Sequence, residues 1–344
     1  MSQNLIQIKA FLGKYYPELA YSVQQEKYNK ANLLKFFEQR FVIQNNKVQM
    51  IIDPSLKGLV AVVNGNELFV SQELHDHEYI DITNSADGNN PGNNPKSLYT
   101  PDIFSSMAYL ICQNHTMLTI VGEIEEPIYI RYKCDFETFQ NSVVIVNVSE
   151  GIDVEIVEEY ESYCAINSVI NYILQQNARV NVSTFYQNHM SALSFCLRNV
   201  IVQDNAKYSH ILFGKGSSNV LDETRVQPNH RSSVELLGCM NPGQQEFHTI
   251  VGVLPGAQDY DFFLDHRHMV SGKGRTTFTP LIIGHLPGTA HTNVSSLVLD
   301  HFARGFWPEK SEEFLSPILD RATLERTVGV TRFYSNKSKF LQFQ

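Results

Sequence analysis

The chain has 344 residues, of which 43% are hydrophobic and 18% charged, and its formal net charge is −9. This length and apolar content allow one large globular domain or two ordinary ones and exclude a disordered chain. The negative charge argues against nucleic-acid binding, since phosphate contacts require a basic face.

The N-terminus and the cysteines bear on where the protein is located. The first residues, MSQNLIQIKAFLGKYYPEL, mix polar and apolar side chains and lack a small-residue cleavage site, so they do not resemble a signal peptide. No run of about 18 apolar residues predicts a membrane-spanning helix. The five cysteines are odd in number and include no C-x-x-C pair, which argues against a disulfide framework and a zinc finger. We therefore expect a cytoplasmic protein whose cysteines are mostly buried free thiols.

The N-terminal region is predicted to contain two helices and a hairpin. Apolar residues at helical spacing predict helices over 4–16 and 32–41. Two apolar runs, LVAVV (59–63) and ELFV (67–70), flank the turn Asn64-Gly65-Asn66. Because Asn and Gly tolerate the positive φ angles of a tight turn, this pattern predicts a β-hairpin.

Short apolar segments recur from about residue 117 to 300, with turn residues between them. Many begin 10–14 residues apart, a spacing typical of either a β-sandwich or a β-solenoid. The segments NARVNVSTFYQ at 177 and NAKYSHILFG at 205 resemble one repeated unit, and Asn, Gly and Ala suit the corners of a parallel β-helix. We therefore predict a mainly β protein with a β-helix core in preference to a sandwich. The predicted strands are 143–148, 154–160, 166–174, 179–186, 197–203, 207–214, 231–238, 246–254 and 275–284.

These patterns divide the chain into four regions. The N-terminal helices and hairpin occupy 1–83, and a flexible linker rich in Asn, Gly and Pro occupies 84–97. The β-helix core covers 98–315, and a short C-terminal helix and tail cover 316–344. In the tail, the helical pattern is confined to 316–327.

Five segments in this order resemble the SufB/SufD family of iron–sulfur cluster assembly proteins, and they resemble SufD most closely. None of them is specific alone, but their order along residues 58–293 is. The segments are GLVAVVNGNELFVSQEL (58–74), MAYLICQNHTMLTIVGEIEEPIYIRY (107–132), VVIVNVSEGIDVEIVEEYES (143–162), EFHTIV (246–251) and GRTTFTPLIIGHLPGTAHTN (274–293).

The resemblance implies a right-handed parallel β-helix with helical ends. It also implies that SufB- and SufD-type subunits pair, that a SufC ATPase docks on C-terminal helices, and that a SufD-type subunit supplies a His from a Cys/Thr-His-Gly-Ala motif. The chain departs from this pattern, since no His-Gly-Ala follows Asn293 and the tail has little room for docking helices. A SufC-type partner is therefore not expected.

We expect a non-catalytic, SufD-like scaffold or accessory subunit that pairs with a SufB-like subunit or with itself. One alternative is a diverged relative that keeps the binding surface without cluster assembly. Another is a β-helix enzyme acting on carbohydrate, for which Asp259, Asp261 and Asp265 are candidate paired carboxylates. The missing secretion signal argues against that enzyme. The acidic run 157–162 is interpreted as a solvated strand edge.

Histidines are concentrated near the C-terminal end of the predicted solenoid. DHRH places His266 and His268 two residues apart, on one face of a strand. With His291 and Cys239 they form a candidate site for iron, zinc or an iron–sulfur cluster, because imidazole and thiolate suit those metals. The spacing matches no recognised metal site, so solvent-facing or backbone-bonded histidines are the favoured interpretation.

Three aromatic residues follow the last predicted strand: Phe302, Phe306 and Trp307. They either pack over the end of the solenoid or anchor a partner, since aromatic residues dominate interface hot spots. An uncapped solenoid end leaves strand edges open to another chain. We therefore predict a dimer in which these three residues belong to the interface.

Overall fold

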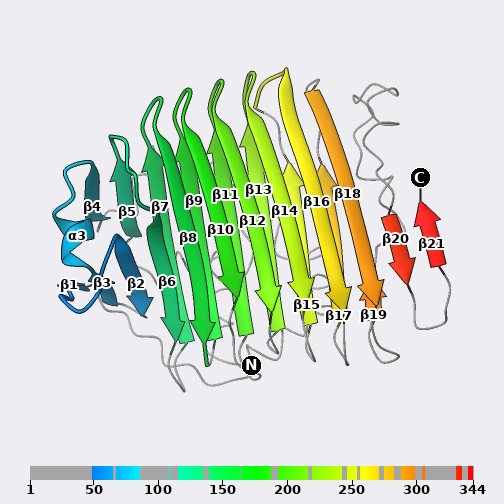
Figure 1. Ribbon diagram of the computed structural model, residues 1–344, viewed down its shortest axis with the longest axis horizontal. Helices are drawn as coiled ribbons and strands as arrows, with labels where there is room; N and C mark the ends of the chain where they lie inside the picture. Colours follow the sequence, from blue (N-terminus) through cyan, green and yellow to red (C-terminus); the bar gives the residue numbers. More distant parts are fainter. Residues whose placement is uncertain are drawn as a thin grey trace, which may run out of the picture.

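A computed structural model describes residues 49–64, 67–85, 108, 115–134, 139–163, 165–186, 193–215, 219–241, 246–253, 256–270, 275–282, 288–298, 304–306, 331–334 and 340–343. Within these residues the only complete helix is α3 (Gln72–His75), and the rest of the regular structure is β-strand (Figure 1). None of the described helices is long and apolar enough to cross a membrane.

The strands fall into three groups along the chain. The N-terminal group is β1 (Gln49–Ile52), β2 (Val60–Asn64), β3 (Glu67–Val70) and β4 (Ile80–Ser85). The central group is β5 (His115–Ile120), β6 (Ile128–Cys134), β7 (Phe139–Val148), β8 (Asp153–Ser162), β9 (Ala165–Leu174), β10 (Arg179–Tyr186), β11 (Leu193–Val202), β12 (Lys207–Lys215), β13 (Asn219–Pro228), β14 (Ser233–Asn241), β15 (Glu246–Val253), β16 (Tyr260–Val270), β17 (Arg275–Ile282), β18 (Gly288–Val298) and β19 (Arg304–Phe306). The C-terminal pair is β20 (Thr331–Tyr334) and β21 (Phe340–Phe343).

The central strands wind into a parallel β-solenoid with two sheets. Sheet A contains β1, β3, β2 and the even-numbered strands from β6 to β18, and sheet B contains β4, β5 and the odd-numbered strands from β7 to β19. Each central strand pairs in parallel with the next strand but one, so the chain passes from one sheet to the other at every step. Val180, for example, is in register with Val154 and Tyr208, 26 and 28 residues away. One turn therefore takes a little under 30 residues, and the predicted β-helix is confirmed.

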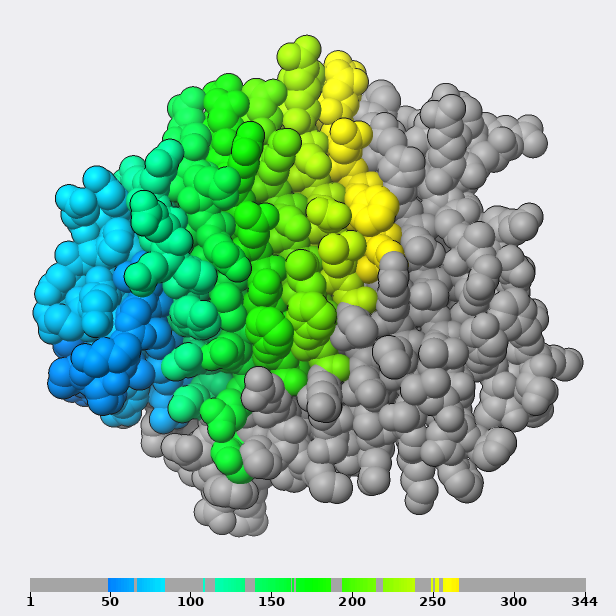
Figure 2. Space-filling view, viewed as in Figure 1, coloured from blue at the N-terminus to red at the C-terminus, as the bar shows by residue number. Residues whose placement is uncertain are grey.

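The repeated unit recognised at 177 and 205 is one turn of this solenoid, since Arg179 on β10 pairs with Lys207 on β12. The 10–14-residue spacing of the predicted strands corresponds to half a turn. Figure 2 shows the successive turns as bands of colour that follow one another across the molecule.

One corner of the solenoid repeats the same backbone conformation on five turns. Gly151, Asn177, Asn205, Arg231 and Asp259 all have φ between 54° and 74°, and each lies between a strand of sheet B and the next strand of sheet A. Only Gly, Asn and Asp adopt this left-handed conformation readily. The expectation that Asn and Gly mark the corners is therefore confirmed, and Arg231 is the strained member of the column.

The predicted hairpin is present as β2 and β3, which pair antiparallel, and β2 also pairs in parallel with β6. β4 pairs antiparallel with β5, so the N-terminal strands continue both sheets of the solenoid. In α3, the side chain of Ser71 caps the helix by accepting from the Leu74 amide. The predicted helices over 4–16, 32–41 and 316–327, and residues 86–97 of the predicted linker, lie outside the described residues, so the four-region division remains a prediction.

The apolar core lies between the two sheets. Residues of β10 alternate between exposed or half-buried and fully buried, so the outer face of sheet A meets solvent there. In contrast, β9 is buried on both faces along almost its whole length. Ile156 and Val182, chosen from the sequence as inward-facing, both belong to the core, each 1% exposed.

Candidate functional site

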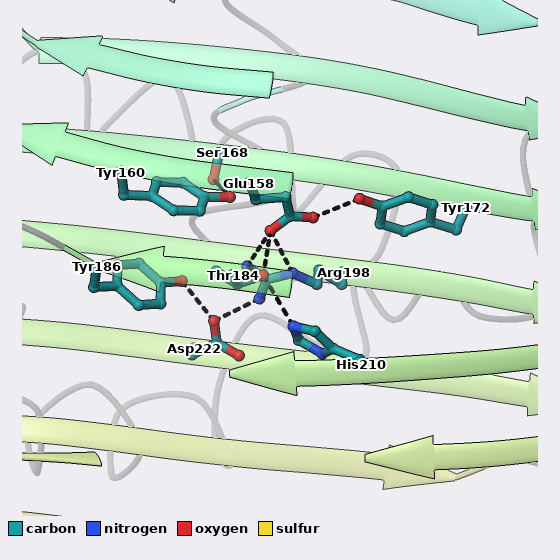
Figure 3. A network of polar contacts seen from close by, with 9 residues as sticks. All are labelled: Glu158, Tyr160, Ser168, Tyr172, Thr184, Tyr186, Arg198, His210 and Asp222. Carbon is teal, nitrogen blue, oxygen red and sulfur yellow. Dashed lines mark hydrogen bonds and ion pairs between the residues drawn. The ribbon is translucent and has the colours of Figure 1, made fainter. Parts of the chain in front are cut away.

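A connected set of polar side chains lies inside the solenoid, between the two sheets (Figure 3). We call it the interior network. The strands of sheet A supply Glu158, Tyr160, Thr184, Tyr186 and His210, and those of sheet B supply Ser168, Tyr172, Arg198 and Asp222.

Arg198 on β11 is the centre of the network, and its side chain is fully buried. Its Nε and Nη2 donate to Oε2 of Glu158 at 2.8 and 2.5 Å. Its Nη1 donates to Oδ2 of Asp222 at 2.5 Å, and Nη2 also donates to Oγ1 of Thr184 at 3.2 Å. Both carboxylate side chains are fully buried too. One guanidinium therefore joins two carboxylates that come from opposite sheets.

The β-helix geometry brings these residues together from distant parts of the sequence. Inward positions alternate along each strand, and register stacks Glu158 beside Thr184 in sheet A and Cys196 beside Asp222 in sheet B. Arg198 lies two residues after Cys196, so both lie on the inner face of β11. The network thus spans strands β8 to β13, whose residues lie up to 64 positions apart.

The charges inside the network determine its protonation. Burial alone would lower the pKa of Arg198, but Asp222 and Glu158 outweigh that effect and hold the pKa well above its ordinary value. Arg198 is therefore always a cation. Burial raises the pKa of Asp222, which Arg198 and Tyr186 only partly oppose. A carboxylate with one guanidinium contact thus remains costly to ionise in this environment.

Hydrogen bonding fixes the tautomer of His210. The hydroxyl of Thr184 donates to Oε2 of Glu158 at 2.8 Å, which uses its one proton. Nε2 of His210 lies 2.9 Å from the same hydroxyl oxygen. Because that oxygen is left only as an acceptor, Nε2 must carry the hydrogen. Oε1 of Glu158 accepts a hydrogen bond from the Tyr172 hydroxyl at 2.6 Å, so both carboxylate oxygens of Glu158 have hydrogen-bond partners.

A ladder of tyrosines runs beside the charged residues. The rings of Tyr132 and Tyr160 stack with centroids 4.6 Å apart, and those of Tyr160 and Tyr186 stack at 4.7 Å. Tyr186 donates to Oδ2 of Asp222 at 2.5 Å, and the hydroxyls of Tyr160 and Ser168 lie 3.3 Å apart. Burial is the main reason that the pKa of each of these three tyrosines is raised well above its ordinary value, so all three stay neutral hydroxyls.

Cys196 is a free, buried thiol beside this network, where it interacts with Ser168 and Tyr186. Burial raises its pKa to about 12, an effect that the nearby Arg198 charge does not cancel. A thiol with this pKa stays protonated at neutral pH, whereas nucleophiles and metal ligands are thiolates. The predicted class of buried, unreactive cysteine is therefore confirmed for Cys196.

The described geometry suits a structural role in which buried ion pairs hold the two sheets together. Every charged group of the network is buried and paired, and the network joins sheet A to sheet B on consecutive turns. A general acid or base has to reach a substrate, and the Glu158 and Asp222 side chains are 0% exposed. The interpretation of 157–162 as a solvated strand edge is wrong at Glu158 and Tyr160, because both side chains point into the solenoid.

The predicted metal ligands lie on neighbouring strands of sheet A. Cys239 on β14 is in register with the residue between His266 and His268 on β16, and His291 on β18 is in register with Phe263. Because alternate residues face opposite sides of a strand, Cys239 and His291 occupy one set of positions and the two other histidines occupy the other. The side chains of these four residues are not among those described, so the metal site remains a prediction. Among the described side chains, no three His, Cys, Asp or Glu residues form a group that could hold a metal ion.

The other predicted site residues are spread apart. Phe306 ends β19, whereas Phe302 and Trp307 lie outside the described residues, so the interface also remains a prediction. Asp259 is at a solvent-exposed corner, and Asp261 and Asp265 lie on β16. Four residues of strand separate the backbones of Asp261 and Asp265 by about 13 Å, which is wider than either carboxylate spacing found in glycosidases. Asp259 and Asp261 are two residues apart, so the carbohydrate-enzyme alternative remains a prediction.

Comparison with known families bears on the solenoid itself. Residues 132–283 match the family model described as "SUF system FeS cluster assembly, SufBD core domain". The match begins within β6 and ends just after β17. It supports the resemblance to the SufB/SufD family and indicates a part in iron–sulfur cluster assembly. A search of curated proteins finds no match to the chain.

Proposed function

We propose that this chain is a SufD-like, non-catalytic scaffold subunit of iron–sulfur cluster assembly, which acts in the cytoplasm by pairing with a SufB-like or SufD-like subunit. The observation that carries the proposal is the match of residues 132–283 to the SufBD core, because it coincides with the parallel β-solenoid from β6 to β17.

The interior network supports a scaffold role over a catalytic one. Its carboxylates are paired with Arg198 away from solvent, and Cys196 is held as a neutral thiol. These groups stabilise the stacking of turns, so they are suited to holding a rigid surface for a partner. Rigid elements present a binding surface with less loss of conformational entropy than loops do.

The C-terminal end of the solenoid supports the pairing role. β18 is the last strand of sheet A and β19 the last of sheet B. Among the described strands none pairs with the outer edge of either, although β20 lies against β18 and covers part of that end. A strand edge that is left uncovered attracts another chain, and β19 is the edge to which this applies. Phe306 belongs to β19, which places one of the predicted aromatic anchors at this end.

Anaerobic co-purification from the native cell tests the proposal. The chain is tagged, isolated under gentle conditions, and its bound proteins are identified by mass spectrometry. We expect a SufB-like or SufD-like subunit in a fixed ratio, and no SufC-type ATPase in a direct binary contact. Recovery of the chain without any such subunit, at native abundance, would contradict the scaffold role.

Iron transfer in the purified complex separates the two scaffold hypotheses. A complex that assembles a cluster only when this chain is present supports a working subunit. A complex that forms normally and assembles clusters equally well without the chain indicates a diverged binding protein instead.

A further inference from the structure

The tyrosine ladder inside the solenoid ends at a glycine. Tyr132, Tyr160 and Tyr186 occupy register positions on β6, β8 and β10, and the next position, on β12, is Gly214. Tyr186 therefore has a ring neighbour on one side and a residue without a side chain on the other. A glycine within a buried strand often marks a place where another group approaches closely.

The hydroxyl of Tyr186 bonds to Asp222, and at this end of the ladder two buried oxygens have no hydrogen-bond partner among the described residues. They are Oδ1 of Asp222 on β13 and Oγ1 of Thr249 on β15. Asp222 is fully buried and Thr249 is 1% exposed. A buried polar atom left without a partner costs about 1–3 kcal/mol, which is why nearly all such atoms in folded proteins are bonded to protein or to ordered water.

The two oxygens belong to neighbouring strands at the same register position, since Asp222 pairs with Thr249 in sheet B. Adjacent strands lie about 4.8 Å apart. A water molecule that bonds to two oxygens at about 2.8 Å each spans a gap of this size. Direct contact between the two side chains does not satisfy either oxygen, because neither has the other as a partner.

We infer that the interior of the solenoid contains a binding site for an ordered water molecule at the end of the tyrosine ladder, bridging Oδ1 of Asp222 and Oγ1 of Thr249. The water donates one hydrogen to the Asp222 oxygen and exchanges a second hydrogen bond with the Thr249 hydroxyl. It completes the interior network on the side of Asp222 that Arg198 and Tyr186 leave open.

The donor set fits water better than a metal cation. A metal cation such as calcium takes about six to eight oxygen ligands, whereas two unpartnered oxygens lie at this place in the described structure. A buried water makes about two to four hydrogen bonds, and these two oxygens supply two of them.

A crystal structure at about 1.5 Å resolution, where ordered water is well defined, tests the site directly. We expect a single density peak at hydrogen-bonding distance from both oxygens. A parallel crystal soaked in rubidium, whose anomalous signal identifies a monovalent cation, should show no anomalous peak there. A rubidium peak would show that a cation occupies the site instead of water. A protein atom bonded to Oδ1 of Asp222 would show that there is no room for a water. Either result overturns the inference.

Two substitutions of Thr249 test the site in solution. Thr249→Val keeps the shape and removes the hydroxyl, whereas Thr249→Ser keeps the hydroxyl. Oxygen-17 relaxation dispersion counts long-lived internal waters, and we expect one fewer in the valine variant and an unchanged number in the serine variant. Equal counts in the wild type and both variants, with all three folded by circular dichroism, would overturn the inference. If the valine variant fails to fold, the density at Oδ1 of Asp222 in the wild-type crystal decides the inference.

Discussion

Arg198 and Glu158 join the two sheets of the solenoid through two hydrogen bonds to a single carboxylate oxygen. Nε and Nη2 of Arg198 both reach Oε2 of Glu158, at 2.8 and 2.5 Å, and the two residues are 40 positions apart in sequence. Removing one member of such a buried pair strands the other charge, whereas removing all the charges together costs much less. The effect of replacing one charged residue of the network on stability therefore depends on whether the other charged residues are present.

Arg198→Met is expected to destabilise the chain strongly. The substitution leaves Glu158 and Asp222 buried without their cation, which costs about 3–5 kcal/mol, a large part of a typical total of about 5–15 kcal/mol. The triple change Glu158→Gln, Arg198→Met, Asp222→Asn should recover much of the loss. Urea unfolding followed by circular dichroism measures both.

Arg179→Met is the matched control, because Arg179 is exposed on the outer face of the neighbouring strand β10. It should change the free energy of unfolding by less than about 0.5 kcal/mol. If the single variant Arg198→Met has the same free energy of unfolding as this control, the network does not stabilise the contact between the two sheets.

The solenoid assignment predicts that a charge placed in the core unfolds the chain. Ile156 and Val182 belong to the buried core and pair with each other in register. Either one changed to Asp buries a carboxylate without a partner, which costs several kcal/mol. Thermal melting should show loss of the folded state for both, while Asn181→Asp, at an exposed neighbouring position, should melt near the wild type. Normal melting of both core variants would contradict the inward placement of these residues.

Whether a strand of this fold can be predicted from the sequence depends on how many charged residues the strand contains. The apolar strands from 143 to 214 were predicted with nearly their observed bounds, because alternation and Asn-rich corners mark them. Between β7 and β18, the strands missing from the prediction are β13, β16 and β18. β13 reads VLDETRVQ over 220–227, and charged residues in such a run ordinarily indicate a loop.

The missed strand β13 contains a central part of the site. Asp222 is charged and yet buried, because its partner Arg198 lies on the adjacent strand, two residues out of register. Alternation of apolar and polar residues cannot find such a position, since the pairing that permits burial is between different turns. The repeat itself offers a signal: the step from Asn177 to Asn205, taken once more, reaches the corner near Arg231 and leaves room for one strand before it.

The free energy of unfolding is expected to fall as the pH rises above 9. Cys196 has a pKa of about 12 in the folded chain, against an ordinary value of 9.0. Above pH 9 the unfolded chain therefore loses this proton while the folded chain keeps it, so stability is full below pH 9 and is lost as the pH rises toward 12. The slope from this group is about −1.4 kcal/mol per pH unit.

Cys196→Ala separates this effect from the tyrosines. Urea unfolding at half-unit steps from pH 8 to 10 should show a shallower decline for the variant, because the buried tyrosines begin to contribute only near pH 10. The same slope in the variant and the wild type over this range would assign the alkaline instability to other groups.

The predicted metal site has a direct chemical test. If His266, His268, His291 and Cys239 hold iron, zinc or an iron–sulfur cluster, anaerobically purified protein should contain one of these metals in a stoichiometric amount. Changing all four residues to Ala should remove it, as measured by elemental analysis and, for iron, by absorbance.

An exposed histidine, His75, and a half-buried one, His77, provide the comparison. His75→Ala with His77→Ala removes imidazoles from the surface near α3, far from the predicted ligands along the solenoid axis. Metal retained in the fourfold variant would place the site elsewhere in the chain. Protein without metal in the wild type would favour the simpler interpretation of these histidines.

Pairing through the C-terminal end of the solenoid is the last prediction. β18 and β19 end the two sheets there, and Phe306 lies on β19 next to the other predicted anchors, Phe302 and Trp307. An interface of about 1,600 Å² is typical of a specific complex, and aromatic anchors near its centre are worth about 2 kcal/mol or more each. Sedimentation across a dilution series should show a dimer, with itself or with a SufB-like subunit. The variant Phe306→Ala, Trp307→Ala should dissociate at a concentration at least about 30-fold higher.

A second pair of aromatics makes the comparison specific. Phe185 and Phe213 stack on the outer face of sheet A, with centroids 5.3 Å apart, and Phe213 is 42% exposed. Changing both to Ala removes similar aromatic surface away from the solenoid end, so this variant should sediment as the wild type does. If instead this pair weakens the dimer and the Phe306, Trp307 pair does not, the partner binds the face of sheet A, because the loss of affinity follows the surface that the partner covers. A wild-type chain that stays monomeric at high concentration and binds no SufB-like subunit would remove the structural basis of the scaffold role.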